Sequence, residues 1–274
     1  NRQKGLDPSS LHNMRTLEEW IDYYNSRQVR YVLRENALNV HFQPIIDKRT
    51  KEIHGYEGLI RGIDKDGSDI PPGLLFKQAK NLDLLFNLDK ACRETVIRAA
   101  AEAGLKSNLF INFLPTAIYN PELCLKTTLE AIRFHDLDAS QITFEVVESE
   151  RIKDFDHLNT ILKYYTKKGF STALDDVGSG YANMETISEL KPAIIKIDQT
   201  IIRDIHKDKK KQKTFKAYYE HSKKNHIKIL AEGVETKEED TYLEAFDIDY
   251  AQGYYYGKPK PTLTDQSNEK EGHL

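Results

Sequence analysis

Short hydrophobic runs alternate with longer amphipathic stretches along most of the chain, which is the pattern of β/α repeats. The short runs predict eight strands, at 40–43, 53–60, 109–113, 142–147, 171–174, 193–197, 227–231 and 249–251. The amphipathic stretches predict helices after most of these strands, at 82–103, 121–134, 154–168, 182–190, 210–225 and 237–246. Such an alternation favours a sheet of mainly parallel strands.

The first two predicted strands depart from this pattern, because only a short turn at 47–50 joins them. They are expected to pair antiparallel, since parallel neighbours need a longer crossover. The 274 residues are sufficient for one large barrel with a buried core. We therefore predict an α/β fold, a modified (β/α)8 TIM-like barrel with an antiparallel first strand.

The two ends of the chain differ from this central part. A capping-box pattern, Thr16-Leu17-Glu18-Glu19, begins a further helix that is expected to run to about residue 36. We predict an N-terminal linker and connector helix at 1–36, the barrel at 37–261 and a polar C-terminal tail at 262–274. The chain begins with Asn1 rather than Met, so an upstream part is expected in a longer protein.

The composition excludes several classes of protein. The net charge of -3 gives no global signature of binding to a nucleic-acid polymer. The two cysteines, Cys92 and Cys124, lack metal-ligand or redox-motif spacing, which suits a reducing compartment. No stretch approaches the roughly 20 apolar residues that span a bilayer, and no signal-peptide pattern is present. We expect a cytoplasmic protein, or the cytoplasmic part of a membrane-anchored one.

Polar side chains gather where the predicted strands end. The residues are Glu57, Asn112, Glu145, Glu148, Asp175, Asp176, Lys196, Asp198, Glu232 and Gln252. In a β/α barrel these strand ends surround one mouth, where active sites are built. An unpaired buried charge is very costly. So many acids on one rim therefore predict cations between them.

Each of these residues also has an ordinary structural explanation. An Asp-Asp pair after a strand is most often a helix cap or turn, and a lone Lys is usually the partner of a carboxylate. The same arrangement on seven successive strands is improbable by chance. Carboxylate and amide oxygens suit Mg²⁺, Mn²⁺ or Ca²⁺. Adjacent acids such as Asp175 and Asp176 can bridge two ions roughly 3.5–4 Å apart, and no zinc motif is present.

Eight motifs around these positions resemble those of the EAL-domain family, in order and at compatible spacing. They are Gln43-Pro44-Ile45, Glu57-Gly58-Leu59-Ile60-Arg61, Ile111-Asn112-Phe113, Glu145-Val146-Val147-Glu148-Ser149, Asp175-Asp176-Val177-Gly178-Ser179-Gly180-Tyr181, Ile195-Lys196-Ile197-Asp198, Ala231-Glu232-Gly233-Val234-Glu235 and Gln252-Gly253-Tyr254. The resemblance covers residues 37–261 and implies a phosphodiesterase that hydrolyses cyclic di-GMP to linear pGpG.

The resemblance also implies a role for each matching residue. One metal would be held by Glu57, Asn112, Glu145 and Asp175, and the second by Asp175, Asp176 and Glu232. Lys196, with a pKa depressed by burial, would position or deprotonate the attacking water. The remaining catalytic positions are Glu148 and Glu235, and the substrate-binding positions are Gln43, Leu59, Arg61, Asp198 and Gln252.

The resemblance further implies two Mg²⁺ or Mn²⁺ ions, inhibition by Ca²⁺, a homodimer and an upstream sensor or GGDEF-type domain. Two departures from the family pattern bear on activity. Gly58 replaces the alanine that names the family, which costs about 0.5–1 kcal/mol of local stability. Val177 and Ser179 replace the more usual Phe and Thr in the loop after Asp176. The alternative is therefore a weak or inactive domain that acts as a cyclic di-GMP receptor or an interaction module.

Overall fold

The computed structural model describes residues 16–17, 26–146, 155–179 and 184–263, and its chain forms two compact units. The larger unit consists of Asn39–Ile60 and Asp89–Leu274, and the smaller of Asn1–Leu38 and Arg61–Leu88. No helix in the described part of the chain is long and apolar enough to cross a membrane.

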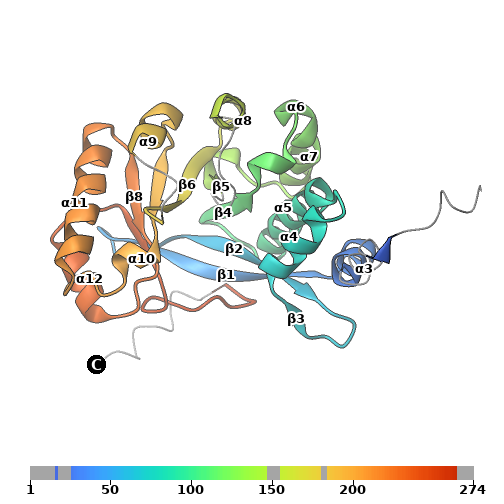
Figure 1. The fold of residues 1–274 in the computed structure, drawn as a ribbon, viewed down its shortest axis with the longest axis horizontal. Coiled ribbons are helices and arrows are strands. Elements are labelled where there is room, and N and C mark those ends of the chain that lie inside the picture. The colour runs from blue at the N-terminus through green and yellow to red at the C-terminus, as the bar shows by residue number, and fades with distance from the viewer. Residues whose placement is uncertain (1–15, 18–25, 147–154, 180–183, 264–274) are drawn as a thin grey trace, which may run out of the picture. The chain divides into compact units, whose positions relative to one another are not determined.

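Eight strands form a closed barrel, most of which belongs to the larger unit (Figure 1). They are β1 (Leu38–Asp47), β2 (Ile53–Ile63), β4 (Asn108–Phe113), β5 (Ile142–Val146), β6 (Ser171–Val177), β7 (Ile194–Ile197), β8 (Lys228–Ala231) and β9 (Tyr250–Gln252). Neighbours follow the order β1-β9-β8-β7-β6-β5-β4-β2, and β1 also pairs with β2. Only β1 runs antiparallel to its neighbours. All eight predicted strands and the antiparallel first strand are confirmed.

The interior of the barrel is filled by side chains from six of its strands. The cluster consists of Ile45, Phe110, Ala173, Ile194, Leu230 and Tyr250. Every residue of β5 and β7 is buried, so these strands are covered on both faces. Strand β7 is accordingly apolar except for Lys196, whereas β5 alternates apolar residues with Thr143 and Glu145, which are buried as well.

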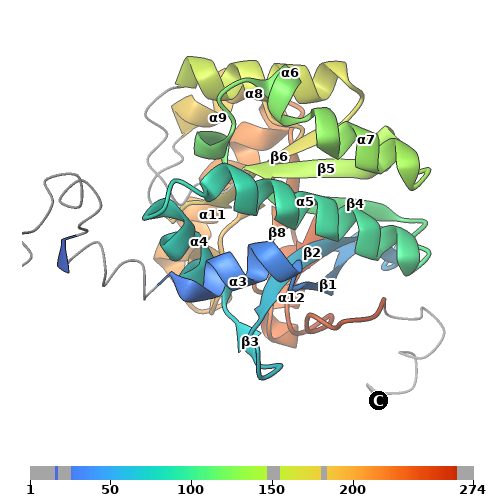
Figure 2. The ribbon, with the colours of Figure 1, turned by 90° about the vertical axis from the view of Figure 1, so that its right-hand side faces the viewer.

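The helices of the barrel lie close to the predicted positions. They are α5 (Leu85–Glu102), α6 (Pro121–Cys124), α7 (Lys126–Phe134), α8 (Phe155–Lys167), α9 (Met184–Leu190), α10 (Gln199–Ile202), α11 (Lys209–Lys224) and α12 (Lys237–Glu244), with short 3-10 turns at Pro115–Ala117 and Ala139–Gln141. Helix α8 packs beside β6 and α9 (Figure 2). The single helix predicted at 121–134 is wrong, because it is interrupted at Leu125, and α10 was not predicted.

The smaller unit contains α3 (Arg27–Glu35), β3 (Asp69–Ile70) and α4 (Pro72–Lys80). The carboxamide of Gln78 on α4 accepts a hydrogen bond from Val29 N at 3.0 Å and so joins α4 to α3. Helix α3 coincides with the second half of the predicted N-terminal helix, whose residues 18–25 lie outside the described residues. Neither β3 nor α4 was predicted, because a two-residue strand has no pattern and α4 begins with Pro72-Gly73.

A buried ion pair on α5 holds the segment that follows β4. Arg93 Nε lies 2.9 Å from Asp89 Oδ2, and both side chains are almost fully buried. The other oxygen, Asp89 Oδ1, accepts a hydrogen bond from Leu114 N at 2.9 Å. Leu114 comes two residues after Asn112, so this contact fixes the chain just beyond one of the candidate metal ligands.

Gly58 faces helix α5, where a side chain would meet Val96. A Cβ atom added at Gly58 would lie 2.4 Å from Val96 Cγ1, which is too close for any real contact. Valine has one strongly preferred rotamer in a helix and cannot easily turn away. The stability cost expected from the sequence for Gly58 is therefore wrong in sign, and we expect Gly58→Ala to lower the free energy of unfolding by about 1–3 kcal/mol in urea titrations. Adding Val96→Ala should recover part of this loss, and a Gly58→Ala variant as stable as the unaltered chain would contradict this packing.

His54 on β2 makes the stability of the barrel depend on pH. Its ring stacks on Tyr250 with centroids 4.0 Å apart, and burial together with Lys228 lowers the pKa of His54 below its ordinary value. The unfolded chain therefore binds the proton more tightly, and this stability is lost as the pH falls below about 6.5. We expect His54→Phe to lose less free energy of unfolding than the unaltered chain between about pH 7.5 and about pH 5.5. An equal loss in both would contradict this role of His54.

Candidate active site

Four buried or half-buried carboxylates surround one buried ammonium at the carboxyl ends of the strands. Lys196 Nζ lies 2.9 Å from an oxygen of Glu145 and 2.9 Å from an oxygen of Glu232. Its distances to Asp175 Oδ1 and Glu57 Oε2 are 3.1 Å and 3.6 Å. Strands β2, β5, β6 and β7 and the residue after β8 thus bring together side chains that are far apart in the sequence.

Glu57 links this cluster to three amide side chains. Its Oε1 accepts a hydrogen bond from Asn112 Nδ2 at 2.8 Å, and its Oε2 accepts one from Gln252 Nε2 at 2.8 Å. The same Gln252 nitrogen lies 3.2 Å from Gln43 Oε1. Predicted residues on β1, β2, β4 and β9 therefore form one hydrogen-bonded chain.

A bulge in β6 turns two adjacent carboxylates toward the same place. Side chains of neighbouring residues in a regular strand point to opposite faces. The register of β6 against β7 shifts between Leu174 and Val177, and Asp176 has a positive φ of 53°. As a result, one oxygen each from Asp175, Asp176 and Glu232 lie within 4.8 Å of one another. This local irregularity creates a possible binding site for a cation.

The carboxylates differ in their affinity for protons. Burial, reinforced by Glu57, raises the pKa of Glu145 well above its ordinary value. Burial, reinforced by Asp175, also raises the pKa of Glu232 well above its ordinary value and that of Asp176 to about 6. Burial alone would raise the pKa of Glu57 as well, but Lys196 and the amide donors outweigh it and lower the pKa. Together, the carboxylates around Lys196 can carry more negative charge than its single ammonium group can balance.

The expected depression of the Lys196 pKa is wrong for the chain by itself. Burial alone would lower this pKa, but Asp175, Glu145 and Glu232 outweigh burial and raise it well above the ordinary value of lysine. The sequence predicts the burial of the Lys196 ammonium group, which lowers its pKa, but not the carboxylates that touch it, which raise its pKa. Lys196 is thus a buried cation that holds the acidic cluster together.

The donor set fits hard divalent cations. Asp175, Asp176 and Glu232 each offer a carboxylate oxygen. Deeper in the cluster, Glu145 Oε2 is buried and has no hydrogen-bond partner among the described residues, as expected of an atom meant for a ligand. Oxygen atoms of carboxylates and amides are the ligands that Mg²⁺, Mn²⁺ and Ca²⁺ prefer.

A cavity of about 260 Å³ opens beside this cluster. It is lined by seven predicted residues, Gln43, Glu57, Asp176, Asp198, Glu232, Glu235 and Gln252. It is also lined by Gln199, Gly233, Gly253 and Tyr254, which were not predicted. Gly233, Gly253 and Tyr254 lie within the motifs given above and Gln199 directly follows one, so the motif segments themselves were the signal that could have identified them.

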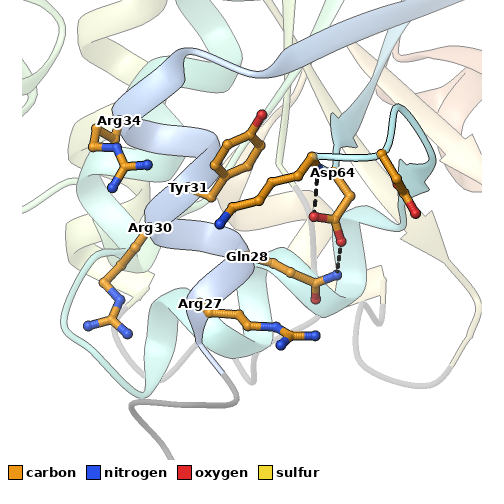
Figure 3. A pocket seen from close by; sticks show the side chains of 8 residues that line it. Arg27, Gln28, Arg30, Tyr31, Arg34 and Asp64 are labelled. Atoms are coloured by element: carbon orange, nitrogen blue, oxygen red, sulfur yellow. Dashed lines mark hydrogen bonds between the residues drawn. The ribbon is translucent and has the colours of Figure 1, made fainter.

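A second cavity, of about 600 Å³, lies in the smaller unit (Figure 3). It is lined by Arg27, Gln28, Arg30, Tyr31, Arg34, Asp64, Lys65 and Asp66. Its Asp64 accepts a hydrogen bond from Gln28 at 2.8 Å. Four of the eight lining side chains are cationic, and among the described residues Asp64 and Asp66 do not belong to a group of three possible metal ligands.

Two predicted residues contact side chains or backbone groups outside the acidic cluster. Asp198 begins helix α10, and its Oδ1 accepts a hydrogen bond from Thr200 N at 2.8 Å. Glu235 forms a two-pronged ion pair with Arg203, with distances of 2.5 Å and 2.6 Å. Both still line the cavity, so these contacts set the direction of their carboxylates.

Among the predicted residues that the structure describes, Leu59 and Arg61 are found neither in the acidic cluster nor in the lining of the cavity. Leu59 and Arg61 follow Glu57 on β2 at the spacing of side chains on one face of a strand. Arg61 belongs to the smaller unit. Glu148 lies outside the described residues. The roles of all three stay predictions.

Known proteins are similar to this chain in sequence and in fold. PdeR of Escherichia coli, named a cyclic di-GMP phosphodiesterase, is 27% identical over 92% of this chain and 38% of its own length. A standalone EAL protein of Vibrio cholerae, solved with c-di-GMP bound, is 39% identical with a TM-score of 0.76 and covers 83% of this chain and 94% of its own. BlrP1 of Klebsiella pneumoniae, solved as a complex with manganese and cyclic di-GMP, is 28% identical with a TM-score of 0.74 and covers 82% and 56%.

The chain spans between 28% and 55% of the length of eight curated relatives that it matches. A family model described as EAL domain matches residues 26–259, which include both the barrel strands and the acidic cluster. The fold, the motifs and the geometry at the strand ends agree with this match. The chain belongs to the EAL domain family.

Proposed function

We propose that this chain hydrolyses one phosphodiester bond of cyclic di-GMP to give linear pGpG, with two divalent cations. The observation that carries the proposal is the convergence of Glu57, Glu145, Asp175 and Glu232 on Lys196. PdeR, a relative of modest identity, is named a phosphodiesterase for this substrate, which supports the same activity here.

The charge of the cluster supports two cations rather than one. With Asp176, five carboxylates stand against the single ammonium of Lys196. When all five are ionised, as metal ligands must be, four negative charges are left over, which two divalent ions would balance. One ion would be held by Glu57, Asn112, Glu145 and Asp175, and the second by Asp175, Asp176 and Glu232. We propose Mg²⁺ or Mn²⁺, and manganese accompanies cyclic di-GMP in the BlrP1 complex.

Ions bound by these oxygens would supply Lewis acidity toward the phosphodiester and its attacking water. The chain supplies position and charge. Lys196, fixed by its carboxylate partners, is directed at the water, and the amides of Gln43 and Gln252 offer donors and acceptors to the nucleotide. Leu59, Arg61 and Asp198 are proposed to contact the substrate, and Glu148 and Glu235 to support the catalytic residues. Calcium is proposed to inhibit, because it prefers more ligands and looser geometry than Mg²⁺.

The rest of the proposal concerns the whole protein. A homodimer and an upstream sensor or GGDEF-type domain are proposed from the family resemblance, as are a cytoplasmic location and the division into 1–36, 37–261 and 262–274. These proposals can be tested by sedimentation of the purified chain and by the sequence of the gene that encodes it.

Turnover of cyclic di-GMP by purified protein with Mn²⁺ is the experiment that tests the function. We expect linear pGpG by chromatography, no product after removal of metal with EDTA, and recovery when Mn²⁺ is restored. Calcium added to the Mg²⁺ reaction should lower the rate. Full turnover with calcium alone would contradict the proposed role of the metals.

A second candidate function is a receptor that binds cyclic di-GMP and signals through a partner. It is favoured by Val177 and Ser179, which follow the bulge that carries Asp175 and Asp176. Val177 is fully buried and pairs with Ile197, so it takes a place in the core beside the site. Binding of cyclic di-GMP without product, in the presence of Mn²⁺, would favour this candidate over the hydrolase.

A further inference from the structure

The acidic cluster contains one member whose place depends on a loop. Glu145, Asp175 and Lys196 lie within strands, where the sheet fixes their backbone. Glu232 lies just past the end of β8, in the loop at 232–236 that leads to α12. The loop turns at Gly233, which has a φ of 66°. The sheet holds the first part of this loop, since Glu232 N donates to Ile197 O of β7 at 3.0 Å and Val234 N donates to Gln252 O of β9 at 3.1 Å, but other contacts must hold Glu235 and Thr236.

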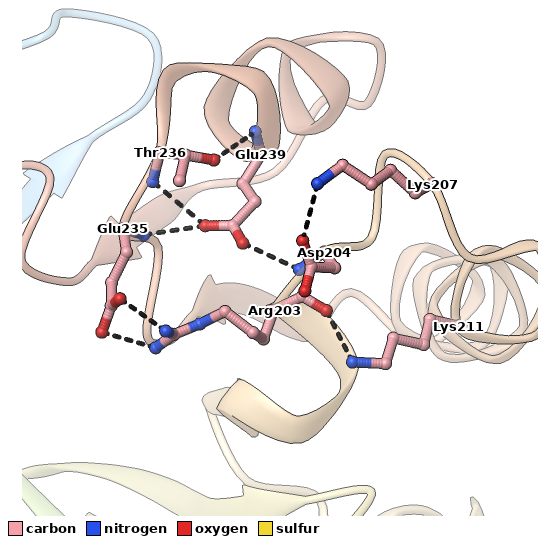
Figure 4. A network of polar contacts seen from close by, with 7 residues as sticks. All are labelled: Arg203, Asp204, Lys207, Lys211, Glu235, Thr236 and Glu239. Atoms are coloured by element: carbon pink, nitrogen blue, oxygen red, sulfur yellow. Dashed lines mark hydrogen bonds and ion pairs between the residues drawn. The ribbon is translucent and has the colours of Figure 1, made fainter.

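Glu239, in the first turn of α12, binds the backbone of this loop through its carboxylate (Figure 4). Its side chain is fully buried. Glu239 Oε2 accepts hydrogen bonds from Glu235 N at 2.8 Å and from Thr236 N at 3.1 Å, and Oε1 accepts one from Asp204 N at 2.8 Å. One carboxylate thus joins the loop to the turn after α10.

A helix cap accounts for only part of this arrangement. Thr236 and Glu239 form a capping box, in which the glutamate needs to accept only from the first residue of the box. The contacts with Glu235 and Asp204 lie outside the box and reach into two other segments. Burial alone would raise the pKa of Glu239, but its three amide donors outweigh burial and lower it, so the group is ionised.

The turn after α10 makes a second contact with the loop at 232–236, through Arg203. Arg203, which precedes Asp204, holds the carboxylate of Glu235 with both terminal nitrogens. This turn is fixed to α11, since Lys211 Nζ donates to Arg203 O at 2.6 Å, and within the turn Lys207 Nζ donates to Asp204 Oδ1 at 3.1 Å (Figure 4). The loop that carries Glu232 is therefore braced against α10 and α11 through two carboxylates.

We infer that Glu239 is a positioning residue for the candidate metal site, because it fixes the loop that presents Glu232 beside Asp175 and Asp176. The inference rests on the proposed function, in which Glu232 binds a metal. Glu239 does not line the cavity, and it acts only through the backbone of Glu235, Thr236 and Asp204. Removing a residue that orients a metal ligand typically weakens metal affinity by about 10- to 100-fold.

Calorimetric titration of the full chain with Mn²⁺ tests the inference without relying on turnover. We expect Glu239→Ala to raise the Kd for Mn²⁺ by about 10- to 100-fold. Glu239→Gln keeps the volume of the side chain but turns an NH2 group toward a backbone N–H, so a smaller rise of about 3- to 10-fold is expected. The Gln variant also guards against a failure of the Ala variant to fold.

Two matched variants separate positioning from stability. Glu238→Ala removes an exposed glutamate next to Glu239 on the same turn of α12. Thr236→Ala removes the hydroxyl that accepts from Glu239 N at 3.3 Å but leaves the three bonds to the Glu239 carboxylate. Thr236→Ala should lower the melting temperature, because it weakens the cap of α12. Both variants should bind Mn²⁺ within about twofold of the unaltered chain.

The outcomes are distinct. Unchanged Mn²⁺ affinity in both Glu239 variants would overturn the inference while leaving the proposed function intact. So would an equal loss in Thr236→Ala and Glu239→Ala, because stability alone would then explain it. Weaker Mn²⁺ binding in the Glu239 variants, with no pGpG from the unaltered chain, would support the inference and contradict the hydrolase. Absence of Mn²⁺ binding by the unaltered chain would overturn both.

Discussion

Replacing Glu57 with alanine is expected to lower kcat/KM for cyclic di-GMP by at least about 10³. Glu57 is buried, and its two oxygens accept hydrogen bonds from Asn112 and Gln252 while one of them lies 3.6 Å from Lys196. The alanine variant would lose a proposed metal ligand, remove the acceptor of Asn112 Nδ2 and leave Gln252 Nε2 with Gln43 Oε1 in place of two acceptors. A loss of several kcal/mol of transition-state stabilisation corresponds to a factor of this size.

The measurement is steady-state hydrolysis at saturating Mn²⁺, followed by the appearance of pGpG. Glu52→Ala is the matched control, since Glu52 is an exposed glutamate in the turn that leads into the same strand. We expect its kcat/KM to stay within about twofold of the unaltered chain. If Glu57→Ala kept most of its activity, the acidic cluster would not be the catalytic centre, and the assignment of the metal ligands would have to be abandoned.

Much of the barrel could be predicted from the sequence because each strand carries its own signal. The buried runs at β5 and β7 are bounded by helical patterns, and the turn at 47–50 is too short for a parallel connection. Once the strands are placed, barrel geometry brings Glu145, Lys196 and the other strand-end residues to one mouth. This rule predicts that Lys196 and these carboxylates share one mouth, but it does not predict the distances between them.

The bulge in β6 could not be predicted, although the cluster depends on it. Regular alternation would send the side chains of Asp175 and Asp176 to opposite faces. The shift of register and the positive φ of Asp176 bring them together. No pattern of residues in the sequence predicts the shift or the positive φ. The pKa of Lys196 was mispredicted for a related reason, because its sign is decided by distances to several carboxylates at once.

Contacts between distant side chains were equally beyond the sequence. Arg203 and Glu235 are 32 residues apart, and Asp204 and Glu239 are 35 apart. Their neighbours in the chain explain neither pair, since each contact requires the turn after α10 to meet the loop after β8. Glu235 matched a family motif and was placed near the catalytic residues, whereas its partner Arg203 carried no signal of its own.

Replacing Lys196 with methionine is expected to change both the stability and the activity of the chain. Methionine is unbranched and flexible, so it can occupy the space of the lysine stem. Lys196 is buried with four carboxylates within 3.6 Å. Removing one partner of a buried charged group typically costs about 3–5 kcal/mol, because the remaining charges are left uncompensated. We expect a loss of about this size in the free energy of unfolding measured by urea titration in EDTA.

Activity should fall by about 10²–10⁴ in the same variant, the range found when a proton-transferring or water-positioning group is removed. Lys216→Met is the matched control, because Lys216 is exposed and pairs with Glu220 only at 3.8 Å. Little change in stability or turnover is expected there.

Metal binding gives the sharpest test of the role of Lys196. A ligand that binds only the folded state stabilises it by mass action. With the ammonium gone, bound cations become the only balance for the carboxylates, so Mn²⁺ should recover more stability in Lys196→Met than in the unaltered chain. An alternative is that protons already neutralise the cluster, since the pKa values of Glu145 and Glu232 are raised. In that case the metal-free variant would be as stable as the unaltered chain, and Lys196 would serve the reaction without holding the site together.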